Sequence, residues 1–361
     1  MTVVAFDTKE FNRGLDKTFF ACLGVGVEIK NEQNFGKEYI SSFEKISKDF
    51  GFNKTRKIYK AYDMGQRLGF RKAIAFWEKL LEEVQDFIVR LNVYYTILPP
   101  SKIKKVKMYG AQKSKVKEVD ALDFLGRLNP AYVHCCAWKY TEDNVSLPQS
   151  MLLDYFEYEV TEGWNALIER VKPKIYYHGD KCNPFISLAD NLAMLVDVRL
   201  YRFYKNKLRE FYEDNLAMPV DDRLYRKKIG LSGENIVKAF EDIDVNVLAS
   251  PIDLRHLKYV SPYRNQKIDT VPYIARPLII VIPEEIKLAS GRRIIEDSPL
   301  MDAILDKAVD MDGSVKFFDP NIDAKVVKKG DIAVYIGPES EKTALLLKRT
   351  HDIEVMSEKD F

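Results

Sequence analysis

The chain has few cysteines, and their spacing forms no zinc-binding pattern. Its 361 residues include four cysteines, Cys22, Cys135, Cys136 and Cys182, with no C-x-x-C pair. Four scattered cysteines exclude a disulfide scaffold and give no zinc motif. Glycine and proline are also modest, at 17 and 15 residues, which excludes collagen-like and low-complexity chains.

Long apolar segments and an N-terminal targeting signal are missing as well. No apolar run approaches the roughly 20 residues that a membrane helix needs. The segment from Met1 to Asp7 carries no basic region and leads directly into a strand-like run. We therefore expect a cytoplasmic protein with reduced thiols and no membrane partner.

Net charge is also small, but the two signs are distributed unevenly. The 56 basic and 54 acidic residues give a formal charge of +2. Residues 1–230 hold 38 basic and 31 acidic side chains, whereas residues 231–361 hold 18 and 23. The sequence therefore predicts a basic first domain, 1–214, with a basic insertion around 101–130, and an acidic second domain, 215–361.

Hydrophobic patterning predicts that strands and helices alternate along the whole chain. Apolar runs indicate strands, and apolar residues spaced three and four apart indicate helices. Strands are expected at 3–6, 19–29, 56–59, 91–98, 131–138, 174–178, 245–248, 277–283, 314–318, 331–336 and 352–356. Helices are expected at 38–50, 70–91, 152–171, 186–213, 232–240, 299–309 and 339–349. The predicted class is α/β, with parallel pairing in the second domain.

Four carboxylates of the first domain lie at or near the ends of these expected strands. Asp7 ends the first strand, Asp63 follows the third, Asp180 ends a later one, and Asp190 lies in the helix after it. Strand ends meet at one edge of such a sheet, so these acids are expected to converge. Two carboxylates about 4 Å apart repel by roughly 4 kcal/mol at an effective dielectric near 20, and a divalent metal relieves that repulsion.

The same elements carry a resemblance to a known superfamily. The relevant segments are Val4-Ala5-Phe6-Asp7, the glycine-containing run 19–27, and Ser187-Leu188-Ala189-Asp190. Their order resembles the RNase H-like superfamily, which includes RNase H, retroviral integrases, transposases and the Piwi domain. It is most similar to an uncharacterised branch with an N-terminal strand aspartate and a late Leu-Ala-Asp helix, and the similarity covers about residues 1–205.

The resemblance implies a fold, a reaction and a metal site. The fold is an RNase H-like mixed sheet with flanking helices, followed here by a second, smaller α/β domain. Asp7, Asp180 and Asp190 would hold Mg²⁺ or Mn²⁺, with Asp63, or Glu78 in its place, as a fourth carboxylate. Two such ions activate water and stabilise the leaving oxygen of a phosphodiester, so the implied activity is a metal-dependent nuclease that hydrolyses nucleic acid.

Basic segments support a nucleic-acid partner, either DNA or RNA. A lysine-rich run with no intervening acid, and a later helix that mixes cations with aromatic rings, suit phosphate and base contacts. The residues assigned to nucleic-acid binding are Lys102, Lys104, Lys105, Lys107, Lys113, Lys115, Lys117, Arg199 and Arg202. The alternatives are a solvated loop and a helix whose aromatic residues pack inward.

Other interpretations of the acids and of the function remain open. Asp7 and Asp180 are also compatible with turn or cap roles, and Asp190 with pairing to a lysine. Thr8 and Lys9 stand where the similar branch has Glu and Ser, which favours a catalytically inactive module that binds nucleic acid or protein. His178 is either a proton shuttle or a packed histidine.

The acidic second domain has two further readings. Its acid run, 296–323, is either a solvated face or a surface that docks on the basic half or on a protein partner. The last alternative is nucleotide or small-molecule binding by this domain, near Pro283 and Gly337.

Overall fold

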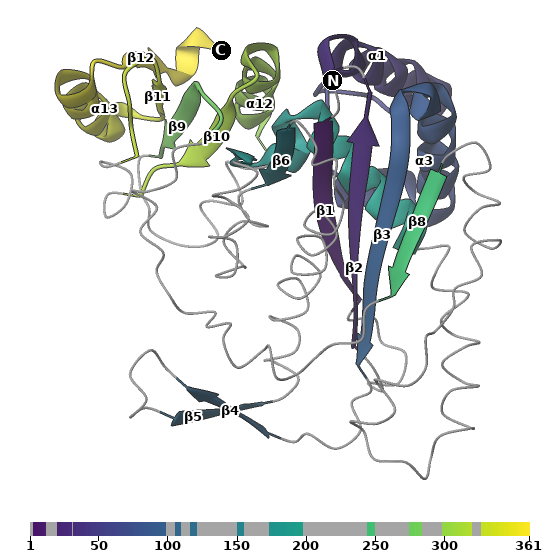
Figure 1. The fold of residues 1–361 in the computed structure, drawn as a ribbon. Coiled ribbons are helices and arrows are strands. Elements are labelled where there is room, and N and C mark those ends of the chain that lie inside the picture. The colour runs from purple at the N-terminus through teal and green to yellow at the C-terminus, as the bar shows by residue number, and fades with distance from the viewer. Residues whose placement is uncertain are drawn as a thin grey trace, which may run out of the picture.

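The computed structural model describes residues 3–11, 20–30, 32–98, 105–109, 116–120, 150–154, 173–197, 244–249, 274–283, 298–319 and 326–361. Its main element is a six-stranded sheet with the order β7-β6-β1-β2-β3-β8 (Figure 1). The strands are β1 (Val3–Phe11), β2 (Phe20–Ile29), β3 (Ile88–Leu98), β6 (Ser150–Asp154), β7 (Lys174–Tyr176) and β8 (Asp244–Ala249).

The sheet is mixed, with an antiparallel centre flanked by parallel pairs. β1 pairs antiparallel with β2, and β2 pairs antiparallel with β3. The pairs β1 with β6, β6 with β7, and β3 with β8 are parallel. Parallel pairs require long crossovers, so the sheet is assembled from segments far apart in the sequence.

Helices cover one face of this sheet. They are α1 (Glu32–Asp49), α2 (Ala61–Leu68), α3 (Phe70–Val84), the 3-10 turn η1 (Gln85–Phe87), the short α7 (Gly179–Cys182) and a helix over residues 184–197 (Figure 1). α1 is helical because Phe35, Tyr39, Phe43 and Ile46 recur at helical spacing, and all four are fully buried.

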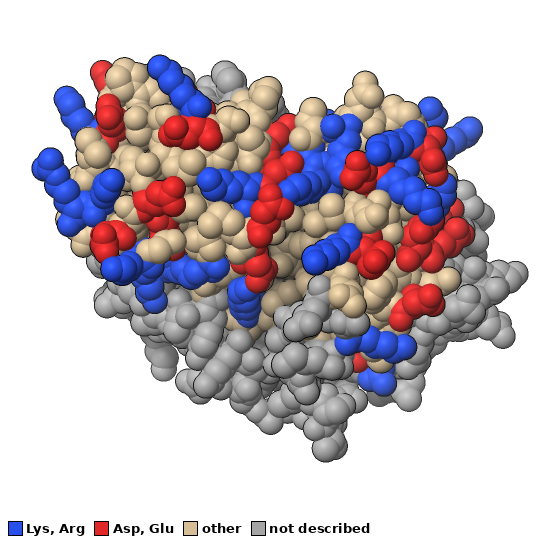
Figure 2. All heavy atoms as spheres, turned by 90° about the horizontal axis from the view of Figure 1, so that it is seen from above, with Lys and Arg blue, Asp and Glu red and all other residues tan. Residues whose placement is uncertain are grey.

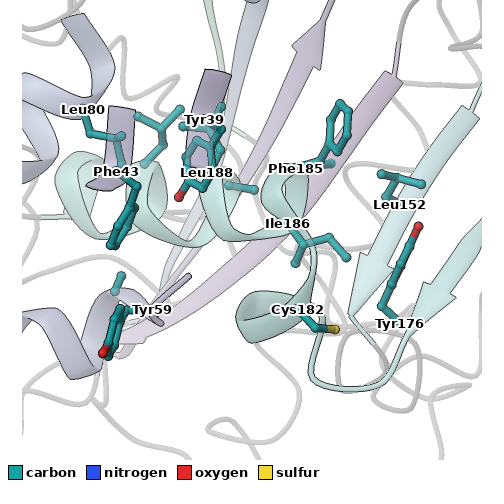
Figure 3. Close-up of a cluster of buried hydrophobic side chains, with 14 of the residues drawn as sticks. Tyr39, Phe43, Tyr59, Leu80, Leu152, Tyr176, Cys182, Phe185, Ile186 and Leu188 are labelled. Carbon is teal, nitrogen blue, oxygen red and sulfur yellow. The ribbon is translucent and has the colours of Figure 1, made fainter. Parts of the chain in front are cut away.

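The core lies between these helices and the inward side chains of the sheet. Val3 and Ala5 of β1 share one cluster with Tyr39, Trp77 and Leu188 from three different helices. Figure 3 shows Tyr39, Phe43 and Leu188 side by side above Tyr59, with Leu152 and Tyr176 at the other end. Burying this face stabilises the fold at about 25 cal/mol per Å² of apolar surface removed from water.

A second sheet is formed by the C-terminal residues. Its order is β10-β9-β11-β12, and every pair is parallel. Its strands are β9 (Leu278–Ile282), β10 (Ser314–Phe317), β11 (Ile332–Tyr335) and β12 (Glu354–Ser357). The helices of this part of the chain are α12 (Pro299–Met311), α13 (Pro338–His351) and the 3-10 turn η5 (Glu358–Asp360). All five residues of the central β9 are buried, as its wholly apolar sequence predicts. The α/β class and the parallel second sheet are therefore confirmed.

The two sheets pack into one core. Ile279, Met301 and Ile304 belong to the same cluster of buried residues as Val3 and Ala5. Backbone hydrogen bonds join the two parts: Ala275 N–H donates to Ile175 O across 2.7 Å, and Val315 N–H donates to Tyr177 O across 3.3 Å. None of the described helices is long and apolar enough to cross a membrane.

Two sequence predictions are wrong, and one strand pairs across the domain boundary that the sequence predicts. Residues 56–59 form no strand, because the Tyr59 hydroxyl accepts the N–H groups of Thr55 and Arg56 and closes a turn there. Leu152 and Leu153 lie in β6 rather than in a helix, and both are buried. β8 lies after residue 214, in the predicted second domain. It nevertheless pairs with β3, which belongs to the predicted first domain.

Candidate functional site

The site begins on β1, where its buried face changes from apolar to charged. Side chains two residues apart on a strand share a face, so Asp7 and Lys9 continue the row of Val3 and Ala5. Asp7 is 6% exposed, and the Lys9 side chain is 15% exposed. Lys9 Nζ lies 3.2 Å from Asp7 Oδ2. β1 thus carries an ion pair at the end of the core.

Asp190 meets this pair from the helix over residues 184–197. Its neighbours Leu188, Ala189 and Leu192 are buried in the core, and Asp190 itself has no exposed surface. One carboxylate oxygen accepts a hydrogen bond from Lys9 Nζ. The other oxygen accepts the backbone N–H of Ala61, the first residue of α2, across 2.6 Å. Both oxygens of this buried carboxylate are therefore satisfied, as burial of a charge requires.

Asp180 joins the site through a second lysine. It lies in α7, which follows β7 after two intervening residues, and is 7% exposed. Lys60, which immediately precedes α2, forms an ion pair with Asp180 Oδ2. The carboxylates of Asp190 and Asp7 also attract the Lys60 ammonium electrostatically and raise its pKa. Three acids and two lysines therefore form one cluster, which we call the acid–lysine cluster: Asp7, Lys9, Lys60, Asp180 and Asp190.

The opposite charges of the acid–lysine cluster stabilise one another's ionised forms. Burial lowers the pKa of Lys9, but Asp190 and Asp7 outweigh burial and keep it above its ordinary value. Asp180 raises the pKa of Lys60 well above its ordinary value, against the effect of burial. Burial raises the pKa of Asp180, but Lys60 outweighs it and lowers that pKa to about 2. At neutral pH both lysines are protonated and Asp180 is ionised.

The cluster as arranged does not fit a divalent metal. Carboxylate oxygens are the ligands that Mg²⁺ and Mn²⁺ prefer. Here, however, the Lys9 ammonium occupies the position between Asp7 and Asp190, and a second cation there would be repelled. Within the described ranges, no group of three His, Cys, Asp or Glu side chains is arranged to hold a metal ion.

The loop that supplies Lys60 and Ala61 is held by the C-terminal part of the chain. Asp302, Asp306 and Asp310 recur every four residues and so lie along one face of α12. Asp302 accepts a hydrogen bond from Thr55 Oγ1 at 2.9 Å and lies 3.1 Å from Arg56 Nε. Asp306 accepts the backbone N–H of Lys57 at 2.7 Å, and Asp310 pairs with the Lys57 ammonium. The acid run of the C-terminal part thus docks on a basic segment, one of the two readings of the sequence.

Comparison with known proteins places the chain in a family. A family model described as a domain of unknown function, DUF8203, matches residues 4–271. The chain belongs to the DUF8203 family. The match takes in the large sheet and the whole acid–lysine cluster and ends before β9. An uncharacterized protein of Archaeoglobus fulgidus is 26% identical over 347 residues, which cover 94% of each chain.

Three of the four predicted carboxylates meet in this DUF8203 chain. Asp7, Asp180 and Asp190 belong to the acid–lysine cluster, whereas Asp63 lies on α2 and pairs with Arg56 Nη2 at 3.4 Å. Asp63 is expected at the site only because it follows the strand predicted at 56–59. The structure has a turn at these residues and no strand. Glu78, its alternative, lies on α3.

His178 is a packed residue beside the acid–lysine cluster. It adopts a left-handed backbone conformation with φ of 54° and directly precedes α7. Its ring meets Phe317 edge-on, with centroids 6.4 Å apart. Burial lowers the pKa of His178 to about 4, so the imidazole is neutral at neutral pH. This geometry matches the packed alternative.

The described part of the basic insertion is a short hairpin of the DUF8203 domain, β4 (Lys105–Tyr109) with β5 (Val116–Asp120). Its register sets Lys105 opposite Asp120 and Lys107 opposite Glu118, while Lys117 faces Met108. The other predicted contacts, Lys102, Lys104, Lys113, Lys115, Arg199 and Arg202, lie outside the described residues.

Gly337, named above for nucleotide or small-molecule binding by the second domain, directly precedes α13. The Ser340 hydroxyl bonds back to the carbonyls of Ile336 at 2.6 Å and Gly337 at 2.9 Å. It is therefore directed into its own helix start. Figure 2 shows Lys and Arg beside Asp and Glu on the face that it draws, with a band of acidic side chains between basic ones.

Sequence reasoning missed two members of the site. Lys60 belongs to no motif of the sequence, and the backbone N–H of Ala61 has no side-chain signature. The available signal is that Lys60 stands directly before a helix that begins at Ala61, because the N–H groups of a helix N-terminus bind anions. In the sequence Lys9 is only a departure from the similar branch, whereas in the structure it bridges Asp7 and Asp190.

Proposed function

We propose that this protein is a nucleic-acid-binding module with an RNase H-like fold, in which two lysines take the place of catalytic metal ions. One observation carries the proposal: the Lys9 ammonium lies between Asp7 and Asp190 and contacts both carboxylates. The charge that a divalent ion would neutralise is already neutralised by the chain itself. A cytoplasmic location is part of the same proposal.

The arrangement of the large sheet supports the RNase H-like part. The strand with Asp7 lies at the centre, beside the glycine-containing β2, and the helix with Asp190 follows β7. Asp7 and Asp190 are 183 residues apart in the sequence yet both contact Lys9. The resemblance implies that these two aspartates lie close together, as ligands of one metal site. The excess of basic residues in 1–230 supports a polyanionic partner.

The test combines a binding assay with a cleavage assay on the full-length protein. Fluorescein-labelled single-stranded and duplex DNA and RNA are titrated with protein, and the same substrates are incubated with Mn²⁺ or Mg²⁺. We expect salt-dependent binding without cleavage. Metal-dependent cleavage by the wild type that Asp7→Ala abolishes would overturn the inactive assignment, and absence of binding to every probe would overturn the nucleic-acid assignment.

A divalent-metal nuclease is the second candidate. It is favoured by the meeting of Asp7, Asp180 and Asp190, the three residues expected to be metal ligands, in one cluster. This function requires the Lys9 ammonium to leave the position between Asp7 and Asp190. Equal cleavage by the wild type and Asp7→Ala would show a contaminating nuclease and count against this candidate.

A further inference from the structure

α12 lies at the junction between the C-terminal sheet and the large sheet (Figure 1). One side of this helix is fixed in the core through four buried residues, Met301, Ile304, Leu305 and Ala308. Its carboxylates at positions 302, 306 and 310 instead contact the segment 55–57. A helix that is anchored in the core on one side can hold another segment in a fixed position on the other.

α12 holds the segment that leads to Lys60. The Lys57 backbone N–H donates to Asp306 Oδ1 across 2.7 Å. The Thr55 hydroxyl donates to Asp302 Oδ2 across 2.9 Å. Lys60 comes three residues after Lys57, so the place from which its side chain extends is set by α12.

The residues that follow α12 hold the element that carries Asp180. α12 and β10 both pack against α7. The Cys182 thiol of α7 lies 3.6 Å from Gly313 O. The Tyr176 hydroxyl of β7 donates to Asp312 Oδ1 across 2.8 Å. Asp180 lies two residues before Cys182, so its position too is set from α12 and its C-terminal end.

We propose that α12 together with Asp312 and Gly313 forms a clamp that holds Lys60 and Asp180 in their ion pair. The two partners are 120 residues apart in the sequence, and the clamp contacts the surroundings of each one separately. The clamp lies outside residues 4–271, which the DUF8203 model matches. The C-terminal part is therefore a regulatory element of the candidate site, because displacement of the α12 carboxylates releases Lys60 from Asp180.

This inference rests on the proposed function, in which Lys60 is one of the two lysines that take the place of metal ions, and it adds how that lysine is kept in position. Lys9, the other lysine, is the internal reference. It pairs with Asp7 and Asp190, and neither belongs to the clamp. A clamp that acts on Lys60 must leave Lys9 unchanged.

The experiment measures how fast each lysine of the folded, full-length protein is acetylated by sulfosuccinimidyl acetate, with mass spectrometry as the readout. In the double variant Asp302→Ala, Asp306→Ala we expect Lys60 to react about three- to tenfold faster than in the wild type, the factor that loss of one hydrogen bond of ordinary strength gives. We expect the rate at Lys9 to stay the same. Asp306→Ala alone should give a smaller increase at Lys60 in a less destabilised protein.

Three further variants separate positioning of Lys60 from general loosening. Asp306→Asn keeps an acceptor for the Lys57 N–H and is expected to react like the wild type. Asp310→Ala removes only the pair with the Lys57 ammonium and is the matched control, with no effect expected at Lys60. Asp180→Asn removes the ion pair itself, so adding the double variant to it should not accelerate Lys60 further.

The outcomes separate this inference from the proposed function. Equal acceleration of Lys60 and Lys9 would overturn the clamp, because α12 would then stabilise the fold as a whole. An unchanged Lys60 rate in the double variant, or an additive increase in the Asp180→Asn background, would overturn it as well. The measurement contains no nucleic acid, so a failed clamp leaves the proposed function standing, and a failure to bind any oligonucleotide would not alter the Lys60 rate.

Discussion

The backbone N–H of Ala61 donates to the Asp190 carboxylate across 2.6 Å and joins the start of α2 to a helix 129 residues later. Its other oxygen is held by Lys9, so Asp190 connects β1, α2 and the helix over 184–197 at one buried point. The N-terminus of α2 carries partial positive charge, which favours a carboxylate there. Asp190 is therefore both a central residue of the candidate functional site and a residue that connects three elements of the fold.

Replacement of Asp190 is expected to destabilise the fold strongly. Asp190→Ala leaves the Ala61 N–H without its acceptor and the Lys9 ammonium with Asp7 alone, at a cost of about 3–5 kcal/mol. Asp190→Asn keeps an acceptor for Ala61 and should cost less. Urea unfolding followed by circular dichroism measures both. Asp63→Ala, which removes an acid from α2 outside the acid–lysine cluster, is the control, and an equal loss for both alanine variants would contradict the assignment.

Removal of Lys9 is expected to create a metal site. Lys9→Ala removes the cation that lies between the Asp7 and Asp190 carboxylates. A divalent ion bound there would relieve the repulsion between them. We expect Mn²⁺ to bind Lys9→Ala and to raise its melting temperature, with neither effect in the wild type. Isothermal titration calorimetry and thermal unfolding report the two effects. The control is Lys45→Ala, which breaks the exposed pair with Glu83. Equal Mn²⁺ binding by all three proteins would refute the replacement of metal by lysine.

The three acids of α12 are expected to contribute unequally to stability. Asp302 contacts Arg56, which is 5% exposed, so Asp302→Ala should cost about 2 kcal/mol. Asp306 accepts one backbone N–H, and Asp306→Ala should cost about 1 kcal/mol. Asp310 is 63% exposed, and loss of its pair with Lys57 should cost less than about 0.5 kcal/mol. Chemical denaturation gives the ranking, and a reversed order would show that α12 does not anchor this loop.

The same contacts should control how firmly Ala61 is held. In Asp302→Ala, amide hydrogen exchange at Ala61 is expected to accelerate relative to amides inside α3, because the segment that leads to Ala61 loses its anchor. Unchanged protection at Ala61 would mean that the acid–lysine cluster alone fixes it.

Stability is expected to fall with acid through His178. Burial lowers the pKa of His178 from its usual 6.5 to about 4, so the unfolded chain binds a proton between these values that the folded protein does not. The free energy of unfolding therefore decreases as the pH falls from 6.5 to 4, by about 1–3 kcal/mol from this residue. His178→Asn, which tolerates the left-handed backbone, should flatten this part of the profile. His351→Asn on α13 is the matched control, and identical profiles for all three proteins would contradict the prediction.

Much of the fold is predictable from local pattern alone. The apolar run at β9 and the helical spacing of α1, α3 and α12 specify their own structure, because each element buries the face that its sequence makes apolar. Asp7, Asp180 and Asp190 are also expected to converge because strand ends meet at one sheet edge, but Asp7 lies within β1, Val3–Phe11, and not at its end.

Other features depend on partners that are remote in sequence. The turn at 56–59 forms because Tyr59 accepts backbone N–H groups and α12 supplies carboxylates to the segment 55–57. Leu152 and Leu153 have neighbours at helical spacing but are taken into the sheet by pairing with β1. Lys60 reaches Asp180 only because that turn places it there. None of these partners is visible within a window of a few residues.

The position of β8 has a consequence for how the chain can be divided. β8 covers the outer edge of β3 along residues Arg90 to Tyr95. A fragment that ends at residue 214 leaves the N–H and C=O groups of that edge open to pair with another chain. It also lacks the α12 carboxylates that anchor residues 55–57. Such a fragment should self-associate. The solubility of truncated chains therefore indicates whether each one retains the complete large sheet.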